Sequence, residues 1–266
     1  SGGMGAADAG FLRARVLFLG AMIGSVSSTM DPVYKTPRLY VETLPETLGG
    51  GTVTLSSAQG HYLKNVLRLA VGDELRVFHP GAGEYVATLA DGGKKSDLSC
   101  PLGRQLRGLF TPARRVHVYA PPLAKDRMDF LIEKAVELGM TDFHPIVCER
   151  SQLRAVNNDR LRAQMVEAAE QCERLDLPEL HGIGTLARAL ETATGTIYAA
   201  LERMDALSTP AKIDGDLSVF IGPPGGWSDA ERAMFNGKAQ ALSLGLNVLR
   251  TETAVLAALV RLVDQA

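Results

Sequence analysis

Cysteine is scarce in this chain of 266 residues, which contains 3 cysteines at positions 100, 148 and 172. An odd number of well-separated thiols supports neither a disulfide framework nor a zinc site. The 5 histidines are also scattered, and neither a His-Glu-x-x-His sequence nor a cluster of acidic ligands accompanies them. We therefore expect no bound metal, and the thiol pattern fits a reducing compartment such as the cytoplasm.

An excess of charge of one sign is missing as well. The formal net charge is -2, with 28 basic and 30 acidic residues, which excludes a surface that is positive throughout. Local basic runs remain, because residues 101–115 hold four arginines and no acid, and residues 149–162 hold four arginines against two acids. Each run is as typical of a solvated face as of a nucleic-acid surface.

The chain has no apolar run long enough to span a bilayer near its start. Val16–Ile23 follows Arg13 and Arg15 and so imitates a secretory signal, but it is too short for a membrane helix. The glycine-rich beginning and Met30 favour a tag remnant or an over-extended start. We interpret residues 1–36 as an N-terminal extension and expect no membrane segment.

Short strands dominate residues 37–109. Strand-like stretches occur at 38–43, 52–55, 74–78 and 85–89, separated by glycine turns and by one helical stretch at 61–68. This pattern predicts a small β-barrel. Such barrels often present loops and one sheet face to RNA, although a barrel alone does not specify its ligand.

The pattern changes past Pro112 to alternating strands and helices. Strands are predicted at 116–120, 143–147, 196–201, 217–221 and 244–249, and helices at 126–138, 159–174 and 254–263. A Ser-x-x-Glu capping box at Ser228 and Glu231 predicts a further helix. The last helix is apolar almost all round and must be covered on more than one side. The pattern therefore predicts an open α/β domain with a parallel sheet at residues 114–266.

Two of these predicted strands end in turns that suit a ligand site. Residues 217–221 lead into Gly-Pro-Pro-Gly-Gly at 222–226, and residues 244–249 lead into Arg-Thr-Glu at 250–252. Ligands bind at the carboxyl ends of strands in such sheets. The chain has no Gly-x-Gly-x-x-Gly after its first strand, no phosphate-binding P-loop and no Gly-x-Ser-x-Gly elbow, so neither a dinucleotide fold nor a serine hydrolase is supported.

At these residues the sequence resembles a known family. The segments that carry the resemblance are Ile221–Gly226, Leu249–Ala254, Glu133–Gly139, Glu170–Arg174, Pro37–Tyr40 and His61–Arg68. Together they are similar to the RsmE family, the bacterial 16S rRNA (uracil-N3)-methyltransferases of the SPOUT superfamily. The family loop usually reads Gly-Pro-Glu-Gly-Gly followed by Phe or Leu, whereas this chain has Pro224 and Trp227.

The resemblance implies a PUA-like RNA-binding β-barrel at 37–109, followed by a SPOUT α/β domain at 114–266 with a trefoil knot around a parallel sheet. It further implies S-adenosylmethionine as the cofactor, 16S rRNA or the small ribosomal subunit as the substrate, and a homodimer in the cytoplasm. In this family the cofactor lies against three loops, which should here follow Leu201, Gly222 and Leu244.

The residue types in these loops suit that task. Glycines let the backbone approach a ligand closely, and leucines supply apolar walls. The expected cofactor residues are Leu201, Gly222, Pro223, Gly225, Gly226, Leu244, Gly245, Asn247, Leu249 and Thr251. Without the resemblance, the same glycines are equally typical of turns and the leucines of a core.

Methylation at N3 of uridine requires loss of the N3 proton, so the enzyme must stabilise a uracil anion. Arg250 is the expected cation for the base oxygens, and Glu252 is the candidate proton acceptor. The alternative role for Glu252 is a carboxylate that stabilises a helix N-terminus. RNA contact is expected at six basic residues, Arg38, Lys64, Arg68, Arg127, Arg150 and Arg174.

Two other functions stay open at this point. A Rossmann-like methyltransferase acting on a small molecule would carry its glycine-rich loop after the first strand, which here ends in Ala120-Pro121-Pro122. A non-enzymatic RNA-binding protein would result if Pro224 had abolished cofactor binding.

Overall fold

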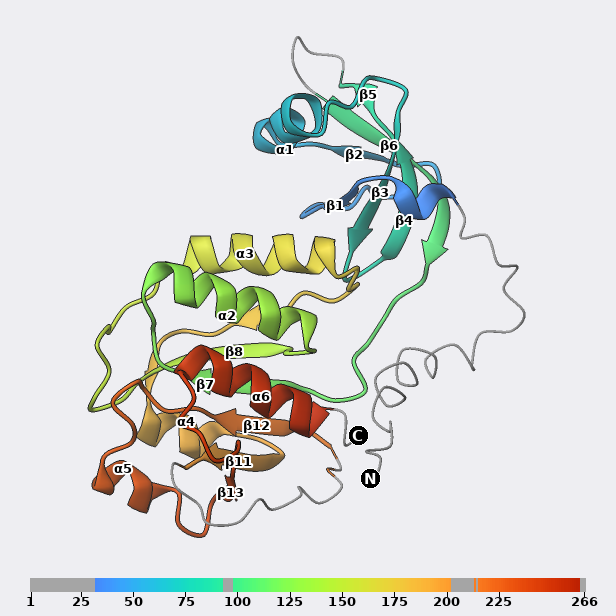
Figure 1. The fold of residues 1–266 in the computed structure, drawn as a ribbon. Helices are drawn as coiled ribbons and strands as arrows, with labels where there is room; N and C mark the ends of the chain where they lie inside the picture. Colours follow the sequence, from blue (N-terminus) through green and yellow to red (C-terminus); the bar gives the residue numbers. More distant parts are fainter. Residues whose placement is uncertain (1–31, 93–97, 202–212, 214, 264–266) are drawn as a thin grey trace, which may run out of the picture. The chain divides into compact units, whose positions relative to one another are not determined.

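The computed structural model describes residues 32–92, 98–201, 213 and 215–263 (Figure 1). The chain forms two compact units, residues 1–36 and 37–266. The first unit is described only at its end, where Pro32–Lys35 forms a 3-10 helix. The signal-like run and Met30 lie outside the described residues, and everything that follows concerns the second unit.

The first sheet of this unit is the predicted barrel. Its strands are β1 (Arg38–Tyr40), β2 (Thr52–Thr54), β3 (Glu74–His79), β4 (Gly83–Thr88), β5 (Ala90–Asp91) and β6 (Leu98–Arg107). They are ordered β1-β3-β4-β6-β2 with β5 beside β6, and all pairs are antiparallel except β1 with β3. Buried leucines and valines such as Leu39, Leu75 and Val77 fill its core.

The helical stretch of the barrel begins earlier than the sequence predicts. Helix α1 spans Ser57–His61 and continues as one π-helical turn, Tyr62–Val66. Ser56 and Gln59 form a capping box that starts the helix at this point.

The second sheet is entirely parallel, as predicted. Its strands are β7 (Val116–Ala120), β8 (Asp142–Val147), β9 (Glu179–Leu180), β10 (Gly184–Thr185), β11 (Thr196–Ala200), β12 (Leu217–Phe220) and β13 (Gln240–Leu242). The order is β10-β8-β7-β12-β11-β13, with β9 paired to β8.

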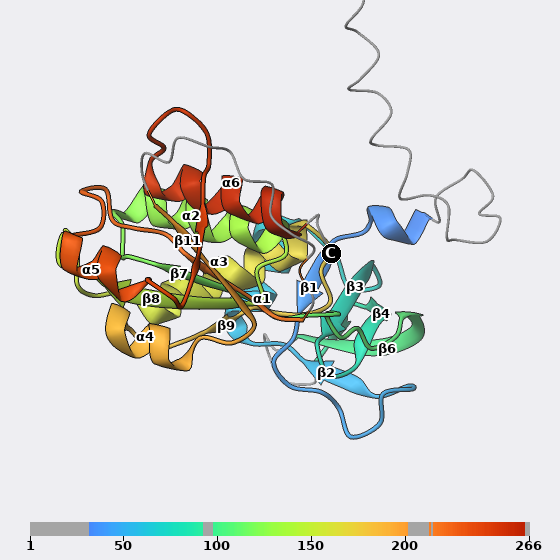
Figure 2. The same cartoon turned by 90° about the horizontal axis from the view of Figure 1, so that it is seen from below.

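Helices cover both faces of this sheet (Figures 1 and 2). Helices α2 (Lys125–Glu137), α3 (Asn158–Gln171) and α6 (Thr251–Val263) pack on one face, and α4 (Leu186–Thr192) and α5 (Asp229–Met234) pack on the other. Side chains alternate between the two layers, so that Val118 faces the first set and Tyr119 the second. Burial on both faces explains why the strands read as continuous apolar runs.

Helix α6 begins at Thr251 and is largely covered. Ala254, Val255, Ala258, Leu259 and Leu262 are buried, whereas Val260 is 51% exposed. The capping box at Ser228 and Glu231 starts α5, as predicted. No helix in the described part of the chain combines the length and the apolar character that a membrane crossing requires.

The strand predicted at 244–249 is wrong. The neighbouring strand, β13, ends at Leu242, and residues 243–250 run as an irregular loop to α6. Leu246 is 96% and Val248 74% exposed. A short apolar run fits a buried strand and a ligand-facing loop equally well, and here the loop is the outcome.

Candidate functional site

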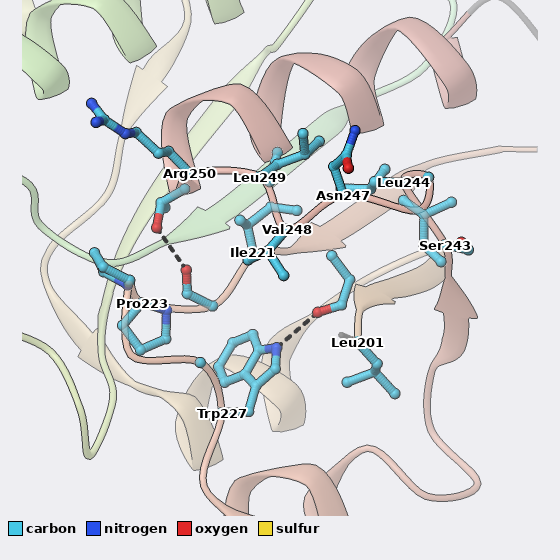
Figure 3. Close-up of a pocket in the computed structure, with 18 of the residues that line it drawn as sticks. Leu201, Ile221, Pro223, Trp227, Ser243, Leu244, Asn247, Val248, Leu249 and Arg250 are labelled. Carbon is cyan, nitrogen blue, oxygen red and sulfur yellow. Dashed lines mark hydrogen bonds between the residues drawn. The ribbon is translucent and has the colours of Figure 1, made fainter. Parts of the chain in front are cut away.

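A pocket of about 750 Å³ lies where β11, β12 and β13 end (Figure 3). Three segments line it: Ala200–Leu201 after β11, residues 221–227 without Gly225 after β12, and residues 242–251 between β13 and α6. Arg127 of α2 and Ala254 of α6 complete the lining. The carboxyl edge of the sheet thus holds the pocket, where ligands of parallel sheets bind.

Nine of the ten residues expected to contact a cofactor line this pocket. They are Leu201, Gly222, Pro223, Gly226, Leu244, Gly245, Asn247, Leu249 and Thr251. The tenth, Gly225, lies behind the turn, where an added Cβ would come within 3.2 Å of the Arg150 Cβ. The sequence did not point to Ile221, Ser243 or Val248, which also line the pocket.

Trp227 joins the loop after β12 to the end of β11. Its indole Nε1 donates to the Ala200 carbonyl at 2.9 Å, and the ring is 2% exposed. A Cβ at Gly222 would lie 3.0 Å from the indole Cε2, so any larger residue would crowd the ring. Phe235 supports the indole edge-on, with ring centroids 4.9 Å apart.

The same turn is fixed from two further sides. Thr251 Oγ1 donates to the Gly222 carbonyl at 3.0 Å, which links the turn to α6. Arg150 Nη1 donates to the Gly225 carbonyl at 3.0 Å. Glu231 accepts from the backbone amides of Glu149 at 2.7 Å and Ser228 at 2.9 Å, so the segment that carries Arg150 is also held.

An ion pair between Arg127, which lines the pocket, and Glu252 joins α2 to the start of α6. Arg127 donates from Nε and Nη2 to the two carboxylate oxygens of Glu252 at 3.0 and 2.6 Å. Burial raises the pKa of Glu252, but the hydrogen bonds from Arg127 and the backbone, together with the charges of Arg127 and Arg250, outweigh burial and leave the pKa below its ordinary value. Glu252 is therefore an ionised, paired carboxylate.

Arg250 differs from Arg127 in having no such pairing. Its exposed guanidinium has no hydrogen bond or ion pair to the described residues, and Figure 3 shows the side chain extending away from the apolar lining. It is a cation at the edge of the pocket that is available to a second ligand.

Four of the five arginines expected to contact RNA are engaged inside the protein: Arg38, Arg127, Arg150 and Arg174. Arg38, with a side chain 3% exposed, donates to Glu84 at 2.7 Å and to the carbonyls of Ala169 and Arg174 at 2.6 and 2.5 Å. Arg174 itself pairs with Asp176 and donates to the backbone carbonyls at the end of α2. Lys64 and Arg68 are exposed on the barrel.

Sequence reasoning missed Glu84, the carboxylate that pairs with Arg38 and with two further arginines. Glu84 is fully buried and accepts from Arg38, from Arg107 at 2.5 Å and from Arg76 at 3.4 Å. Arg76 also pairs with Glu173 beyond α3, at 2.8 Å. A single glutamate in a strand gives no signal of this role in the sequence.

Comparisons with known proteins match both parts of the chain. The family model described as "RNA methyltransferase domain" matches residues 111–263, and that of the "RNA methyltransferase PUA domain" matches residues 55–96. The "Ribosomal RNA small subunit methyltransferase E" of Rickettsia conorii is 32% identical over 206 residues, covering 75% of this chain and 84% of the relative. The chain belongs to this RNA methyltransferase family.

Solved structures of similar proteins agree with the fold. The methyltransferase E of Neisseria gonorrhoeae, described as bound to S-adenosyl methionine, has a TM-score of 0.73 at 29% identity and covers 85% of this chain and 95% of its own. A putative methyltransferase of Legionella pneumophila with bound SAM has a TM-score of 0.74 at 26% identity, covering 85% and 96%. The PUA barrel followed by a SPOUT-like α/β domain is confirmed, and the knot implied by the resemblance stays a prediction.

Proposed function

We propose that this chain uses S-adenosylmethionine to methylate N3 of a uridine in 16S rRNA, in the cytoplasm. The observation that carries the proposal is the pocket formed by the three strand-end segments. Its volume of about 750 Å³ lies within the range of small-molecule sites. The methyltransferase E of Neisseria gonorrhoeae, which shares the fold, is described as bound to this cofactor.

The residues present fit the cofactor. Leu201, Ile221, Leu244 and Leu249 offer apolar surface for an adenine ring, while the turn at Gly222 brings backbone groups to the pocket without side chains. Pro224 replaces the glutamate usual in this family, and it too lines the pocket. The clamping of the turn by Trp227 and Thr251 is made through backbone carbonyls, so it does not need that glutamate.

When bound, S-adenosylmethionine supplies an electrophilic methyl group on a sulfonium. The N3–H bond of uracil must break first, with the proton passing to water or to another acceptor, and the negative charge that remains spreads to the two base oxygens. The nitrogen lone pair would then form the new N–C bond while the methyl–sulfur bond breaks, so that the sulfonium leaves as a neutral thioether. We assign the stabilisation of that charge to Arg250, whose guanidinium lies at the pocket edge and makes no hydrogen bond or ion pair to the described residues.

We assign Glu252 to positioning rather than to proton transfer. Its carboxylate is 8% exposed and holds two hydrogen bonds from Arg127, which together with a lowered pKa make it a poor base. We likewise assign Arg127 to this ion pair, and Arg38, Arg150 and Arg174 to bonds inside the protein.

The RNA contact is proposed for the exposed residues Lys64 and Arg68 of the barrel. Arg68 has a φ of 59°, a left-handed conformation that a non-glycine residue rarely adopts. We expect the affinity for rRNA to fall steeply with salt, and the slope of log K against log salt to shrink by about 1 to 2 in the K64A/R68A variant. Filter binding at several salt concentrations measures this. A flat salt dependence, or the same loss in R188A on α4, would contradict the assignment.

Trp227 is expected to set the cofactor affinity. W227F keeps most of the ring but removes the hydrogen bond to the Ala200 carbonyl, which leaves that acceptor unpaired beside the pocket. We expect the Kd for S-adenosylmethionine to rise about 5- to 30-fold, in line with about 1 to 2 kcal/mol for a lost buried bond. Calorimetry measures the Kd, and an unchanged value would show that the indole acts only as packing.

We also propose a homodimer. Leu246 and Val248 on the loop before α6, and Val260 on α6, are large apolar side chains that are at least half exposed. Apolar surface gathered on adjoining segments marks protein interfaces. Light scattering at micromolar concentration is expected to give twice the chain mass, and a monodisperse monomer would refute this proposal.

The function is tested by incubating the full chain with S-adenosylmethionine and small-subunit rRNA from a strain that lacks the modification. Methylation at N3 blocks base pairing, so primer extension on the product should stop at one uridine. Calorimetry with the cofactor separates the rival role: binding without a stop indicates a different target, and no binding indicates a non-enzymatic RNA-binding protein.

A further inference from the structure

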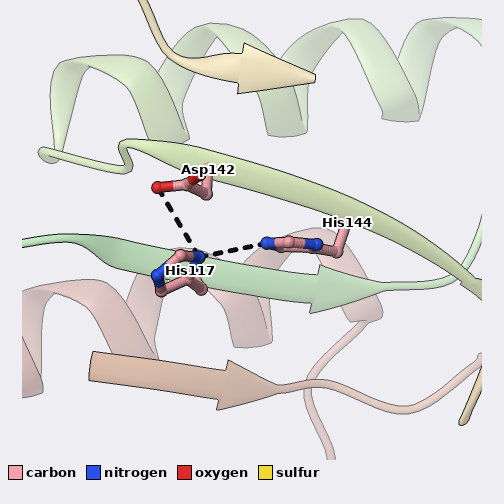
Figure 4. Close-up of side chains that lie close together, drawn as sticks. All are labelled: His117, Asp142 and His144. Atoms are coloured by element: carbon pink, nitrogen blue, oxygen red, sulfur yellow. Dashed lines mark hydrogen bonds and ion pairs between the residues drawn. The ribbon is translucent and has the colours of Figure 1, made fainter. Parts of the chain in front are cut away.

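Three of the five histidines gather at the amino ends of the strands, opposite the cofactor edge. His117 lies directly across from Asp142 in the register of β7 and β8, and His144 follows two residues later on the same face (Figure 4). His181 comes just after β9 and stacks on the His144 ring, with centroids 3.8 Å apart. Nothing in the proposed methyl transfer uses these side chains.

The distances between the candidate ligand atoms of His117, Asp142 and His144 fit a tetrahedral metal site. His117 Nδ1 lies 3.1 Å from His144 Nε2 and 3.5 Å from Asp142 Oδ2. A zinc ion about 2.0 to 2.1 Å from each atom would subtend angles of about 100° and about 115°, on either side of the tetrahedral angle of about 109°.

The third distance, between the ligand atoms of His144 and Asp142, needs only a small adjustment. All three ligand atoms lie within 4.8 Å of one another. Two ligands of one zinc ion can be at most about 4.1 Å apart, so the His144 ring has to move by less than about 1 Å.

The surroundings orient these groups as the outer shell of a metal site does. His117 Nε2 lies 3.3 Å from Thr194 Oγ1, a bond that leaves Nδ1 as the free lone pair facing the cluster when Nε2 carries the proton. Asp142 Oδ2 accepts from Arg115 Nε at 2.7 Å and from Thr141 Oγ1 at 2.7 Å, and Oδ1 lies 2.9 Å from His181 Nε2, so Arg115 must move away from Oδ2 before an ion can bind there.

The protonation states suit metal binding. Burial lowers the pKa of His117, and it lowers the pKa of His144 to about 3, so both rings are neutral at physiological pH. Burial raises the pKa of Asp142, but the bonds from Arg115, His181 and Thr141 lower it further, and the carboxylate is ionised. Neutral imidazole and carboxylate are ligands of zinc.

The competing explanation is a hydrogen-bonded cluster without an ion. Arg115 already neutralises the charge of Asp142, and the carboxylate has hydrogen-bond partners without an ion. The separation of 3.5 Å between His117 Nδ1 and Asp142 Oδ2, however, is too long for a strong hydrogen bond and is the place where an ion would bridge two strands. The Arg115 side chain is 48% exposed, so it can move outward when a divalent ion arrives.

We propose that His117, Asp142 and His144 form a zinc-binding site that joins β7 to β8, with the fourth position left to water or to His181. His181 is 31% exposed and lies on the solvent side of the cluster. On binding, the proton on His144 Nε2 moves to Nδ1, so the ring stays neutral. This departs from the sequence-based expectation of no metal, because strand register rather than sequence spacing brings the ligands together.

The test uses the full chain without a polyhistidine tag, stripped with chelator and titrated with Zn²⁺ by calorimetry and with Co²⁺ by absorption. We expect a single ion per chain and the intense visible bands of tetrahedral Co²⁺. H117A and H144A should each weaken binding at least about 100-fold, whereas H61A, which removes an exposed histidine on the barrel, should not.

Cofactor binding at the opposite edge of the sheet serves as the check on folding. A variant that binds S-adenosylmethionine with the parent affinity but has lost the ion supports the site. Absence of ion binding by the parent chain, equal affinity in the H117A/H144A double variant, or sulfur-to-cobalt charge-transfer bands from cysteine ligands would overturn it.

Discussion

Replacing Arg250 by alanine is expected to lower kcat by about 100- to 1,000-fold while the Kd for S-adenosylmethionine changes by less than about twofold. Removal of one preorganised group that stabilises a developing oxyanion has this effect on other enzymes. Arg250 lines the pocket and makes no side-chain hydrogen bond or ion pair to the described residues, so no such bond is lost with it, although its charge helps to lower the pKa of Glu252. Single-turnover methylation of rRNA measures the rate, and calorimetry measures the Kd.

The matched control for this change is R188A. Arg188 is also an exposed arginine, with a side chain 72% exposed, but it lies on α4 and, among the described residues, its side chain pairs with Glu191 alone. It should keep the parent rate. R250K retains the charge without the planar guanidinium, and its methylation rate should fall between those of R250A and R188A. If R250A and R188A turn over rRNA equally fast, Arg250 has no part in stabilising the uracil anion.

The largest effect on stability is expected from E84Q. The Glu84 carboxylate is fully buried and holds Arg38, Arg76 and Arg107, two of which are themselves almost completely buried. Burial already lowers the pKa of Arg38, and the carboxylate partly offsets that cost. Removing one partner of a buried ion pair costs about 3 to 5 kcal/mol, because the remaining charge is left uncompensated. We expect a loss of this size in the free energy of unfolding, measured by urea denaturation.

E191Q provides the comparison. This change removes the same kind of carboxylate from an exposed ion pair on α4. We expect the free energy of unfolding to fall by less than about 1 kcal/mol. If E84Q and E191Q unfold at the same urea concentration, the buried cluster does not stabilise the barrel in the way proposed.

The sequence predicted those features that depend on local pattern. Apolar runs buried on both faces gave the parallel strands, and the Ser228 capping box gave the start of α5. The turn at Gly222 was predicted to lie at the edge of a ligand site, and it lines the pocket.

Features that depend on distant contacts could not be predicted. Arg38 and Ala169 are separated by 131 positions, and no local signal tells an arginine that binds RNA from one that donates to a buried carbonyl. The histidines come together only through the register of β7 and β8. The run at 244–249 was interpreted as a strand because composition does not show whether apolar side chains are covered by the chain itself or left open, as Leu246 is.

The chain contains a single tryptophan, and that residue forms part of the pocket wall. Its intrinsic emission therefore comes from one place, next to the proposed ligand and bonded to the Ala200 carbonyl. Excitation of the indole gives a label-free optical signal of pocket occupancy in the natural sequence. Stopped-flow fluorescence can follow cofactor arrival and product departure in real time, separately from any step that occurs on the RNA.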